Sequence, residues 1–148
     1  MKKLVKELMT DNFVKVNEDE WIYEALSQIA VSKKSMLVCV VDKEDKLCGI
    51  ITPKEALRAV EVCGYDGAKH PLFSGREVLH LMTSKYAKDI MSAPVFVKTD
   101  DEAQQAIDIM IDRGFYEVPV VDDASKPIGL VTYFGIVSSS IWHCDMEK

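Results

Sequence analysis

The sequence lacks the features that mark several large classes of protein. No apolar run approaches the roughly 20 residues that a membrane-spanning helix needs. The lysines at the start of the chain are followed by no apolar stretch of the kind found in secretory signals. With 7 Gly and 5 Pro, the chain has too few of these residues for a linker-rich or disordered protein. We therefore expect an ordered protein without a membrane span.

Cysteine and histidine are sparse, and their spacing matches no disulfide, metal-binding or nucleophile motif. The 4 cysteines form no Cys-x-x-Cys pair, so without a secretory signal we expect reduced thiols and a cytoplasmic location. The 3 histidines match no metal-binding pattern, and no cysteine belongs to a recognised nucleophile signature. We therefore predict no catalytic residue, no metal site, no required cofactor and no enzymatic activity. The cysteines are Cys39, Cys48, Cys63 and Cys144, and the histidines are His70, His80 and His143.

Positive charge is also scarce. The chain has 18 Lys and Arg against 24 Asp and Glu, a net charge of −6, which argues against a broad basic surface for duplex nucleic acid. Single Lys or Arg residues can still meet a small anionic ligand. What the chain does have is apolar content: 48% of its 148 residues, enough to bury the core of one compact domain or of two half-domains.

An internal repeat decides between these two arrangements. The segment 40–52 contains Val-Val-Asp and then Gly-Ile-Ile-Thr; 80 residues later, 120–132 contains Val-Val-Asp and then Gly-Leu-Val-Thr. Upstream of each segment, an apolar stripe with helical spacing recurs 81 residues apart, and a Met-Thr or Met-Ser pair recurs 82 residues apart. The stripes are Ile22, Ala25, Leu26, Ile29 and Ala30, then Ala103, Ala106, Ile107, Met110 and Ile111; the pairs are Met9-Thr10 and Met91-Ser92.

Each copy predicts the same order of elements, β-α-β-β-α, and hence an α/β fold of the α+β type. The predicted strands are 13–16, 36–41 and 47–52 in the first copy, and 95–97, 118–121 and 128–132 in the second. Acidic runs at 18–20 and 100–102 suit the positive ends of the helices that follow. The closing helices begin near Pro53 and Tyr133.

The repeat also divides the chain. We assign residues 1–62 to the first copy and 86–148 to the second, with a connector at 63–85 that begins as a loop and continues as a helix. A unit of about 60 residues buries little surface and is only marginally stable alone. We therefore expect the two copies to pack sheet to sheet around a shared core, related by a pseudo-two-fold axis.

This order of elements and these motifs resemble the cystathionine-β-synthase (CBS) domain family, in the tandem arrangement called a Bateman module. The resemblance rests on the Met-Thr/Ser start, the Val-Val-Asp strand end and the Gly-x-x-Thr sequence, each present twice. It implies a regulatory module that binds an adenosine-containing ligand, AMP, ADP, ATP or S-adenosylmethionine, in the cleft between the two copies. It also implies a homodimer and a regulated partner protein that the sequence does not identify.

The segment Thr52-Pro53-Lys54-Glu55 has two interpretations. Thr at the N-cap, Pro at the first helical position and Glu at the third form a capping box, which stabilises a helix and requires no ligand. The same helix N-terminus offers N–H groups to a phosphate, and a hydroxyl and a carboxylate can bind the two hydroxyls of a ribose. In the family, the Thr and an Asp three residues later contact the ribose; here Glu55 replaces that Asp.

The resemblance assigns residues to two clefts. The second is expected to be the weaker, because Gly135 stands where the family has its carboxylate. For Val14, Val95, Met36 and Leu37, ordinary core packing is the competing interpretation. The first cleft comprises Ile51, Thr52, Glu55, Val95, Tyr116 and Glu117; the second comprises Val14, Met36, Leu37 and Thr132.

The residues around these motifs suggest limits on the ligand. Glu117 would repel a phosphate, and Tyr133 and Phe134 are expected to pack in the core in preference to stacking on a ligand. The basic residues near the motifs are more typical of solvated surface charges than of phosphate partners; they are Lys54, Arg58, Lys88 and Arg113. A ligand-free module for dimerisation or protein interaction is the alternative function, since the final Asp is missing from both motifs.

Overall fold

The computed structural model describes residues 3–32, 35–64 and 83–146 and contains two compact units. The first, here called the continuous unit, comprises Val14–Pro94. The second, the split unit, combines Met1–Phe13 with Val95–Lys148. Each unit contains one three-stranded sheet with its helices, so the predicted α+β class and the duplicated β-α-β-β-α order are confirmed.

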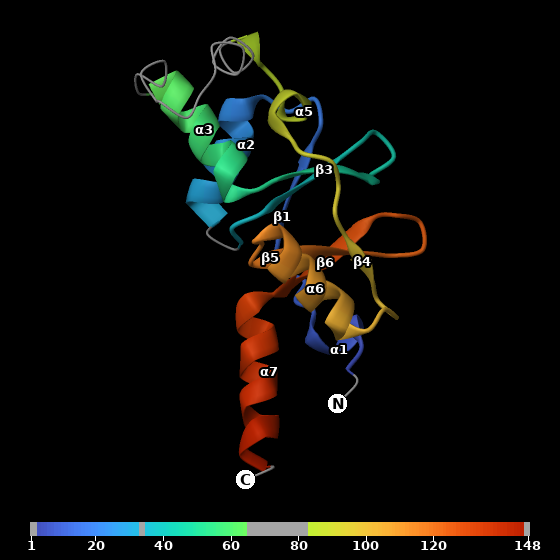
Figure 1. The fold of residues 1–148 in the computed structure, drawn as a ribbon. Coiled ribbons are helices and arrows are strands. Elements are labelled where there is room, and N and C mark those ends of the chain that lie inside the picture. Colours follow the sequence, from blue (N-terminus) through green and yellow to red (C-terminus); the bar gives the residue numbers. More distant parts are fainter. Residues whose placement is uncertain (1–2, 33–34, 65–82, 147–148) are drawn as a thin grey trace. The chain divides into compact units, whose positions relative to one another are not determined.

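The continuous unit contains the sheet β1-β2-β3, in which β2 lies between a parallel and an antiparallel neighbour. Figure 1 shows α2, α3 and α5 grouped at one side of these strands. Their apolar residues form one core with the strands, in which Val38, Ile51 and Ala59 are buried. The elements are β1 (Val14–Asn17), α2 (Ile22–Ser32), β2 (Val38–Val41), β3 (Leu47–Ile51), α3 (Pro53–Gly64) and α5 (Ala87–Ile90).

The split unit repeats this sheet as β4-β5-β6, with the same parallel and antiparallel pairings. Its core includes Val5 from the N-terminal segment together with Val118, Val120 and Val131 from the strands. The elements are α1 (Val5–Leu8), β4 (Val97–Lys98), α6 (Ala103–Arg113), β5 (Glu117–Val121), β6 (Pro127–Thr132) and α7 (Tyr133–Met146).

The repeated Val-Val-Asp sequence ends a strand and builds a β-hairpin turn. The carboxylate of Asp42 accepts the backbone N–H groups of Glu44 (2.8 Å) and Lys46 (3.0 Å). Asp122 does the same for Ala124 and Lys126, at 2.9 and 3.0 Å. An aspartate is needed because its short side chain can bond to the backbone two and four residues later and so close the turn.

The short helical segment that opens each repeat in the sequence belongs to the unit of the other repeat. The Val5 N–H donates to Asp101 O at 2.8 Å in the split unit, and the Ala87 N–H donates to Glu20 O at 2.8 Å in the continuous unit. Ion pairs repeat the pattern, with Lys6–Asp100 at 3.3 Å and Lys88–Asp19 at 2.9 Å. Each unit therefore contains the leading segment of the other copy.

Several sequence-based expectations need correction. The last residues of the apolar stripes, Ala30 and Ile111, are exposed, because eight steps of about 100° turn them well away from the first residue of the stripe. The predicted loop does not start at Cys63, since α3 continues to Gly64. The apolar spacing of Val78, Leu79, Met82 and Tyr86 predicts a connecting helix that runs into the second copy, but Tyr86 pairs in extended conformation with Trp21. Residues 65–82 of that loop and helix lie outside the described residues, and Ser84 and Lys85 are not helical.

Candidate functional site

The Thr52 corner, residues 51–55, is where β3 passes into α3. Ile51 is fully buried at the strand end, and Thr52 is 7% exposed. The carboxylate of Glu55 accepts the Thr52 backbone N–H at 2.9 Å and also the Thr52 hydroxyl, both through Oε2. This is the half of a capping box in which the glutamate reaches back to the N-cap. The predicted pairing of Thr52 with Glu55 is therefore present.

Sequence reasoning did not identify a third member of this corner, Ser92. Its hydroxyl donates to the other carboxylate oxygen of Glu55, Oε1. The Ser92 backbone is held by two bonds with Ile50 of β3, one donated in each direction at 2.8 and 3.1 Å. The only signal in the sequence was the Met-Thr or Met-Ser pair that occurs in both copies. It indicated a repeated position but did not indicate which residue Ser92 contacts.

The repeated glycine of the Gly-x-x-Thr sequence makes this close approach sterically feasible. A Cβ on Gly49 would lie 2.7 Å from Met91 Cγ, and a Cβ on Gly129 would lie 2.6 Å from Met9 Cε. Both distances are far below van der Waals contact, so the methionine side chains would have to move; at Gly129 the Thr10 backbone oxygen is also in the way, and there the segment itself would have to shift. In each unit, this glycine lets the leading segment lie directly against the strand that ends in the threonine.

The Thr132 corner, residues 131–135, is where β6 passes into α7, and its helix is capped differently. The Thr132 hydroxyl oxygen accepts the Gly135 N–H at 3.0 Å, an ordinary N-cap bond. Gly135 supplies no carboxylate, so the hydroxyl hydrogen of Thr132 has no acid at the position that Glu55 occupies in the other unit. The two corners share a backbone path but present different chemical groups.

Three aromatic side chains gather at the Thr132 corner. Tyr116 and Tyr133 meet edge to face with ring centroids 6.1 Å apart, and Tyr133 and Phe134 do so at 5.6 Å. The Tyr133 N–H donates to Tyr116 O at 2.7 Å, which holds the first two together. All three are exposed, with Phe134 at 75%. The prediction that Tyr133 and Phe134 pack in the core is therefore wrong, because α7 directs them away from the buried face of β6.

Glu117 is a buried acid at this corner, only 8% exposed. It opens β5 and stands opposite Thr132 in the antiparallel ladder with β6. An anionic ligand group at Thr132 would therefore approach a carboxylate from within the same unit. The sequence-based expectation places this acid, and its repulsion of a phosphate, in the first cleft with Thr52, whereas its ladder partner in the structure is Thr132 of the second.

The remaining predicted contact residues lie in both units. Val14 and Leu37 are buried in the continuous unit, where Val14 pairs with Val38 and Val38 pairs with Ile51. Met36, next to Leu37, is 46% exposed. Val95 belongs to the split unit and is half-buried just before β4. Core packing therefore accounts for Val14 and Leu37, but it does not account for Met36.

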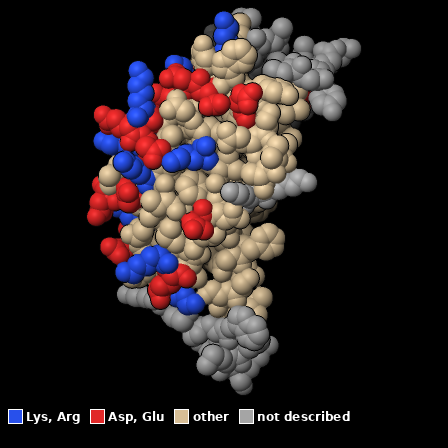
Figure 2. Space-filling model, turned by 180° about the vertical axis from the view of Figure 1, so that it is seen from behind, with Lys and Arg blue, Asp and Glu red and all other residues tan. Residues whose placement is uncertain are grey.

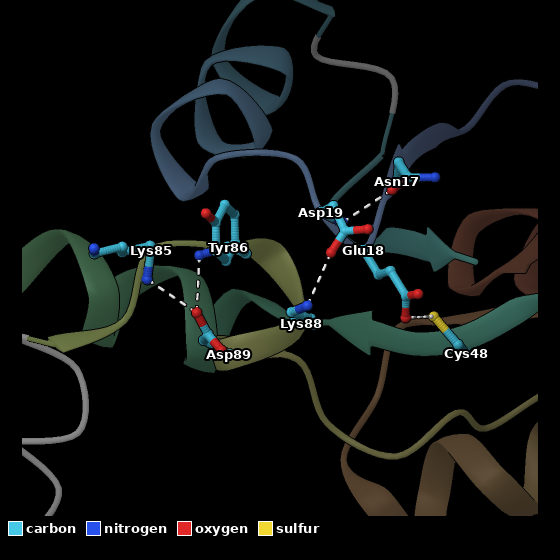
Figure 3. A network of polar contacts seen from close by, with 8 residues as sticks. All are labelled: Asn17, Glu18, Asp19, Cys48, Lys85, Tyr86, Lys88 and Asp89. Atoms are coloured by element: carbon cyan, nitrogen blue, oxygen red, sulfur yellow. Dashed lines mark hydrogen bonds and ion pairs between the residues drawn. The ribbon is translucent and has the colours of Figure 1, made fainter. Parts of the chain in front are cut away.

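Charged groups near the turn after β1 form the network in Figure 3. Lys88 Nζ lies 2.9 Å from Asp19, and this bond raises the pKa of the Lys88 ammonium. Cys48 Sγ lies 3.6 Å from a Glu18 oxygen; burial, followed by repulsion from Glu18, raises the pKa of the thiol to about 11. Lys88 is exposed, as expected for a solvated surface charge, and its ion pair with Asp19 ties α5 to this turn.

The other basic residues form no concentrated patch on the visible surface. Lys54 and Arg113 are exposed and Arg58 is half-buried. Figure 2 shows Lys and Arg interspersed with Asp and Glu on the face it presents. Within 3–32, 35–64 and 83–146, no group of three or more His, Cys, Asp or Glu could hold a metal ion. No helix in the same ranges is long and apolar enough to cross a membrane.

The duplicated units and their Gly-x-x-Thr corners define the class of protein to which the chain belongs. The family model for the CBS domain matches residues 5–62 and 87–140. The chain therefore belongs to the CBS domain family, with two domains in tandem, as the sequence motifs predicted.

Curated relatives include longer proteins. The chain is 38% identical over 96 residues to the uncharacterized protein MK0525 of Methanopyrus kandleri, covering 64% of this chain and 41% of that protein. It is 29% identical over 131 residues to inosine-5′-monophosphate dehydrogenase of Methanocaldococcus jannaschii, covering 88% of this chain and 22% of the enzyme. The chain thus spans less than half the length of each of these relatives.

Solved structures share the fold. CBSX2 in complex with AMP aligns with a TM-score of 0.74 at 22% identity, covering 94% of this chain and 97% of that one; CBSX2 is a CBS-pair protein from Arabidopsis thaliana. The CBS domain pair of protein MJ0100, in complex with 5′-methylthioadenosine and S-adenosyl-L-methionine, aligns with a TM-score of 0.68 at 23% identity. It covers 92% of this chain and 98% of that one.

Proposed function

We propose that the chain is a regulatory module that senses an adenosine-containing ligand at the Thr52 corner. The observation that carries this is the pairing of the Thr52 hydroxyl with the Glu55 carboxylate at the start of a 12-residue helix. The carboxylate can accept both vicinal hydroxyls of a ribose, and the Thr52 hydroxyl beside it can bond to one of them, since ribose hydroxyls donate and accept hydrogen bonds. The adenosine ligands bound by structural relatives support the same ligand class.

The Thr132 corner is proposed as the weaker site. It keeps the threonine hydroxyl but has Gly135 in place of an acid, so one of the two ribose partners is missing. Glu117 disfavours a phosphate at that corner. Neutral or cationic 5′ groups, such as those of 5′-methylthioadenosine or S-adenosylmethionine, are consequently better suited to it than the triphosphate of ATP.

Titration calorimetry with AMP, ATP, 5′-methylthioadenosine and S-adenosylmethionine tests the proposal. Glu55→Ala should weaken the tightest of these ligands at least tenfold, because a charge-assisted bond to a ribose hydroxyl is lost. Asp112→Asn, which removes an exposed acid on α6, is the matched charge control and should bind as the wild type does. If the wild type binds none of the four at millimolar concentration, the chain is not an adenosyl sensor at this corner.

A regulatory role is proposed because the chain matches only part of its longer relatives. It spans 22% of the length of inosine-5′-monophosphate dehydrogenase, so it corresponds to a module of that enzyme and not to the whole. Ligand binding can act on a partner only as far as the ligand distinguishes between two states of the module. The proposed role is non-catalytic, and the partner is another protein or domain.

A second candidate, a dimerisation and interaction module, is favoured by an apolar stripe on α7. Phe134, Val137 and Ile141 are exposed at i, i+3 and i+7, a spacing that places them on one side of the helix. A second copy of the chain could cover such a stripe. Sedimentation of wild type and Ile141→Asp, with and without ligand, distinguishes the candidates: an interaction module dimerises through α7 irrespective of nucleotide.

A further inference from the structure

The carboxylate of Glu55 is already engaged by the protein's own donors. Oε2 accepts the backbone N–H and the hydroxyl of Thr52, and Oε1 accepts the hydroxyl of Ser92. A carboxylate offers about four acceptor positions, so three are in use and roughly one remains. Two ribose hydroxyls that both bond to this group need two positions. At least one internal donor must therefore leave before such a ligand is fully bound.

Ser92 is the donor best able to leave. The Thr52 N–H is fixed by the backbone at the helix start, and its loss would uncap α3. The Ser92 backbone stays bridged to Ile50 whichever way its side chain points, so only rotation about Cα–Cβ is needed to release Oε1. That rotation breaks one hydrogen bond and leaves the sheet intact.

We propose that Ser92 is a positioning residue that occupies the ligand's place on Glu55 and thereby lowers the affinity of the Thr52 corner for ribose. This inference rests on the proposed function, and it adds a residue from the segment between α5 and β4 to the site. In the absence of ligand, the Ser92 hydroxyl satisfies the carboxylate and holds its rotamer. On binding, the ribose hydroxyls replace the Ser92 hydroxyl, so breaking the Ser92–Glu55 bond reduces the net free energy of binding.

The equivalent position in the split unit has no such arrangement. Thr10 corresponds to Ser92 in the repeat, and its hydroxyl oxygen accepts the Asn12 N–H at 3.2 Å. Gly135 provides no carboxylate for it to occupy. Thr10→Ala is thus a matched control, since it removes a hydroxyl at the same place in the fold without freeing an acid.

The test is calorimetric binding of adenosine and of 2′,3′-dideoxyadenosine to wild type, Ser92→Ala, Ser92→Thr and Thr10→Ala. Ser92→Ala should bind adenosine about three to ten times more tightly than wild type, the range expected for one internal hydrogen bond. Its affinity for the dideoxy analogue should not change, because that ligand does not need the Glu55 oxygens. Ser92→Thr keeps the hydroxyl and should restore wild-type affinity, and Thr10→Ala should match wild type for both ligands.

Thermal unfolding of the same variants separates positioning from a merely structural role. Ser92→Ala should unfold at a lower temperature than wild type while binding adenosine more tightly, whereas a simple loss of structure would weaken both ligands. Equal or weaker adenosine binding by Ser92→Ala, or the same change for both ligands, overturns the inference and leaves the proposed function standing. If no variant binds adenosine and the wild type also binds none of AMP, ATP, 5′-methylthioadenosine and S-adenosylmethionine, both are overturned.

Discussion

At the scale of single residues, similar sequence positions in the two copies have acquired different partners. Thr52 donates its hydroxyl to Glu55, whereas Thr132 accepts the Gly135 N–H. A sequence motif records which atoms are available but not which of them bond. Thr52 and Glu55 are three positions apart in the sequence, so their pairing could be predicted from helix-capping rules. Ser92 is 37 residues away from Glu55, and only the fold brings the two together.

Cys48 yields a prediction about pH at this scale. Its thiol contacts Val40 O at 3.4 Å and Glu18 at 3.6 Å, and burial and the Glu18 charge raise its pKa from 9.0 to about 11. At pH 8, the reactive thiolate of Cys48 should therefore be about a hundredfold scarcer than in an unperturbed cysteine. Alkylation by iodoacetamide, followed by mass spectrometry, should be correspondingly slow at this site and faster in Glu18→Gln.

The same shift has a defined effect on stability. The folded-state pKa lies above the unfolded value, so folding favours the protonated thiol. Its contribution to stability is fully present below about pH 9 and is lost as the pH rises toward 11. Cys48→Ser should unfold with a weaker dependence on pH across that window. Rapid alkylation of Cys48 at pH 8 in the folded protein would contradict the assigned environment.

At the scale of elements, the strands and helices follow from local pattern, and the exceptions have local causes. The valine-rich β2 and β5 are buried on both faces, as their continuous apolar sequences predict. Tyr133 and Phe134 were assigned to the core because they are aromatic, yet they are exposed at the start of α7. Residue type alone did not indicate which face of that helix meets the sheet, since α7 is apolar on several sides.

The β5–β6 hairpin provides a test of the repeated aspartate. Asp122→Ala removes two bonds to the N–H groups of Ala124 and Lys126 and should lower the free energy of unfolding by about 1–2 kcal/mol. Ser125, in the same turn, has a φ of 65°, in the left-handed region. Ser125→Asn should raise stability by about 0.5 kcal/mol, since asparagine tolerates that conformation better.

Urea unfolding of both hairpin variants measures these changes. Asp42→Ala is the matched variant in the β2–β3 hairpin, where Asp42 bonds to Glu44 and Lys46 in the same way. It should cost a similar amount, so equal effects in the two hairpins would support a structural role for the motif. An Asp122→Ala protein as stable as wild type would show that these bonds contribute nothing net.

At the scale of the whole molecule, the repeat in the sequence and the units in the structure do not coincide. Segments 1–13 and 14–94 are consecutive in the chain but belong to different units. The sequence shows that Met9-Thr10 and Met91-Ser92 are equivalent positions of the repeat. Their spacing would be the same whether each pair contacted its own copy or the other copy. The exchange of these leading segments between the two units therefore could not be deduced from the repeat and needed the three-dimensional structure.

The exchange predicts where destabilising changes act. Ile90 follows the start of the second repeat but packs in the core of the continuous unit, and Val5 lies in the first repeat but packs in the split unit. Ile90→Ala should cost about 2–4 kcal/mol, and Val5→Ala somewhat less because fewer methyl groups are removed. Each change should weaken the sheet of the unit that holds the side chain, since local opening follows packed units and not sequence order.

Native-state hydrogen exchange in the full chain resolves this by strand. Ile90→Ala should lower the protection of amides in β2 and β3 more than in β5 and β6, and Val5→Ala should do the reverse. Loss of amide protection confined to the mutated residue's own repeat would contradict the placement of each leading segment in the unit of the other repeat. Equal loss in all strands would show instead that the two units unfold together, in which case the exchanged segments make one cooperative structure from the two sheets.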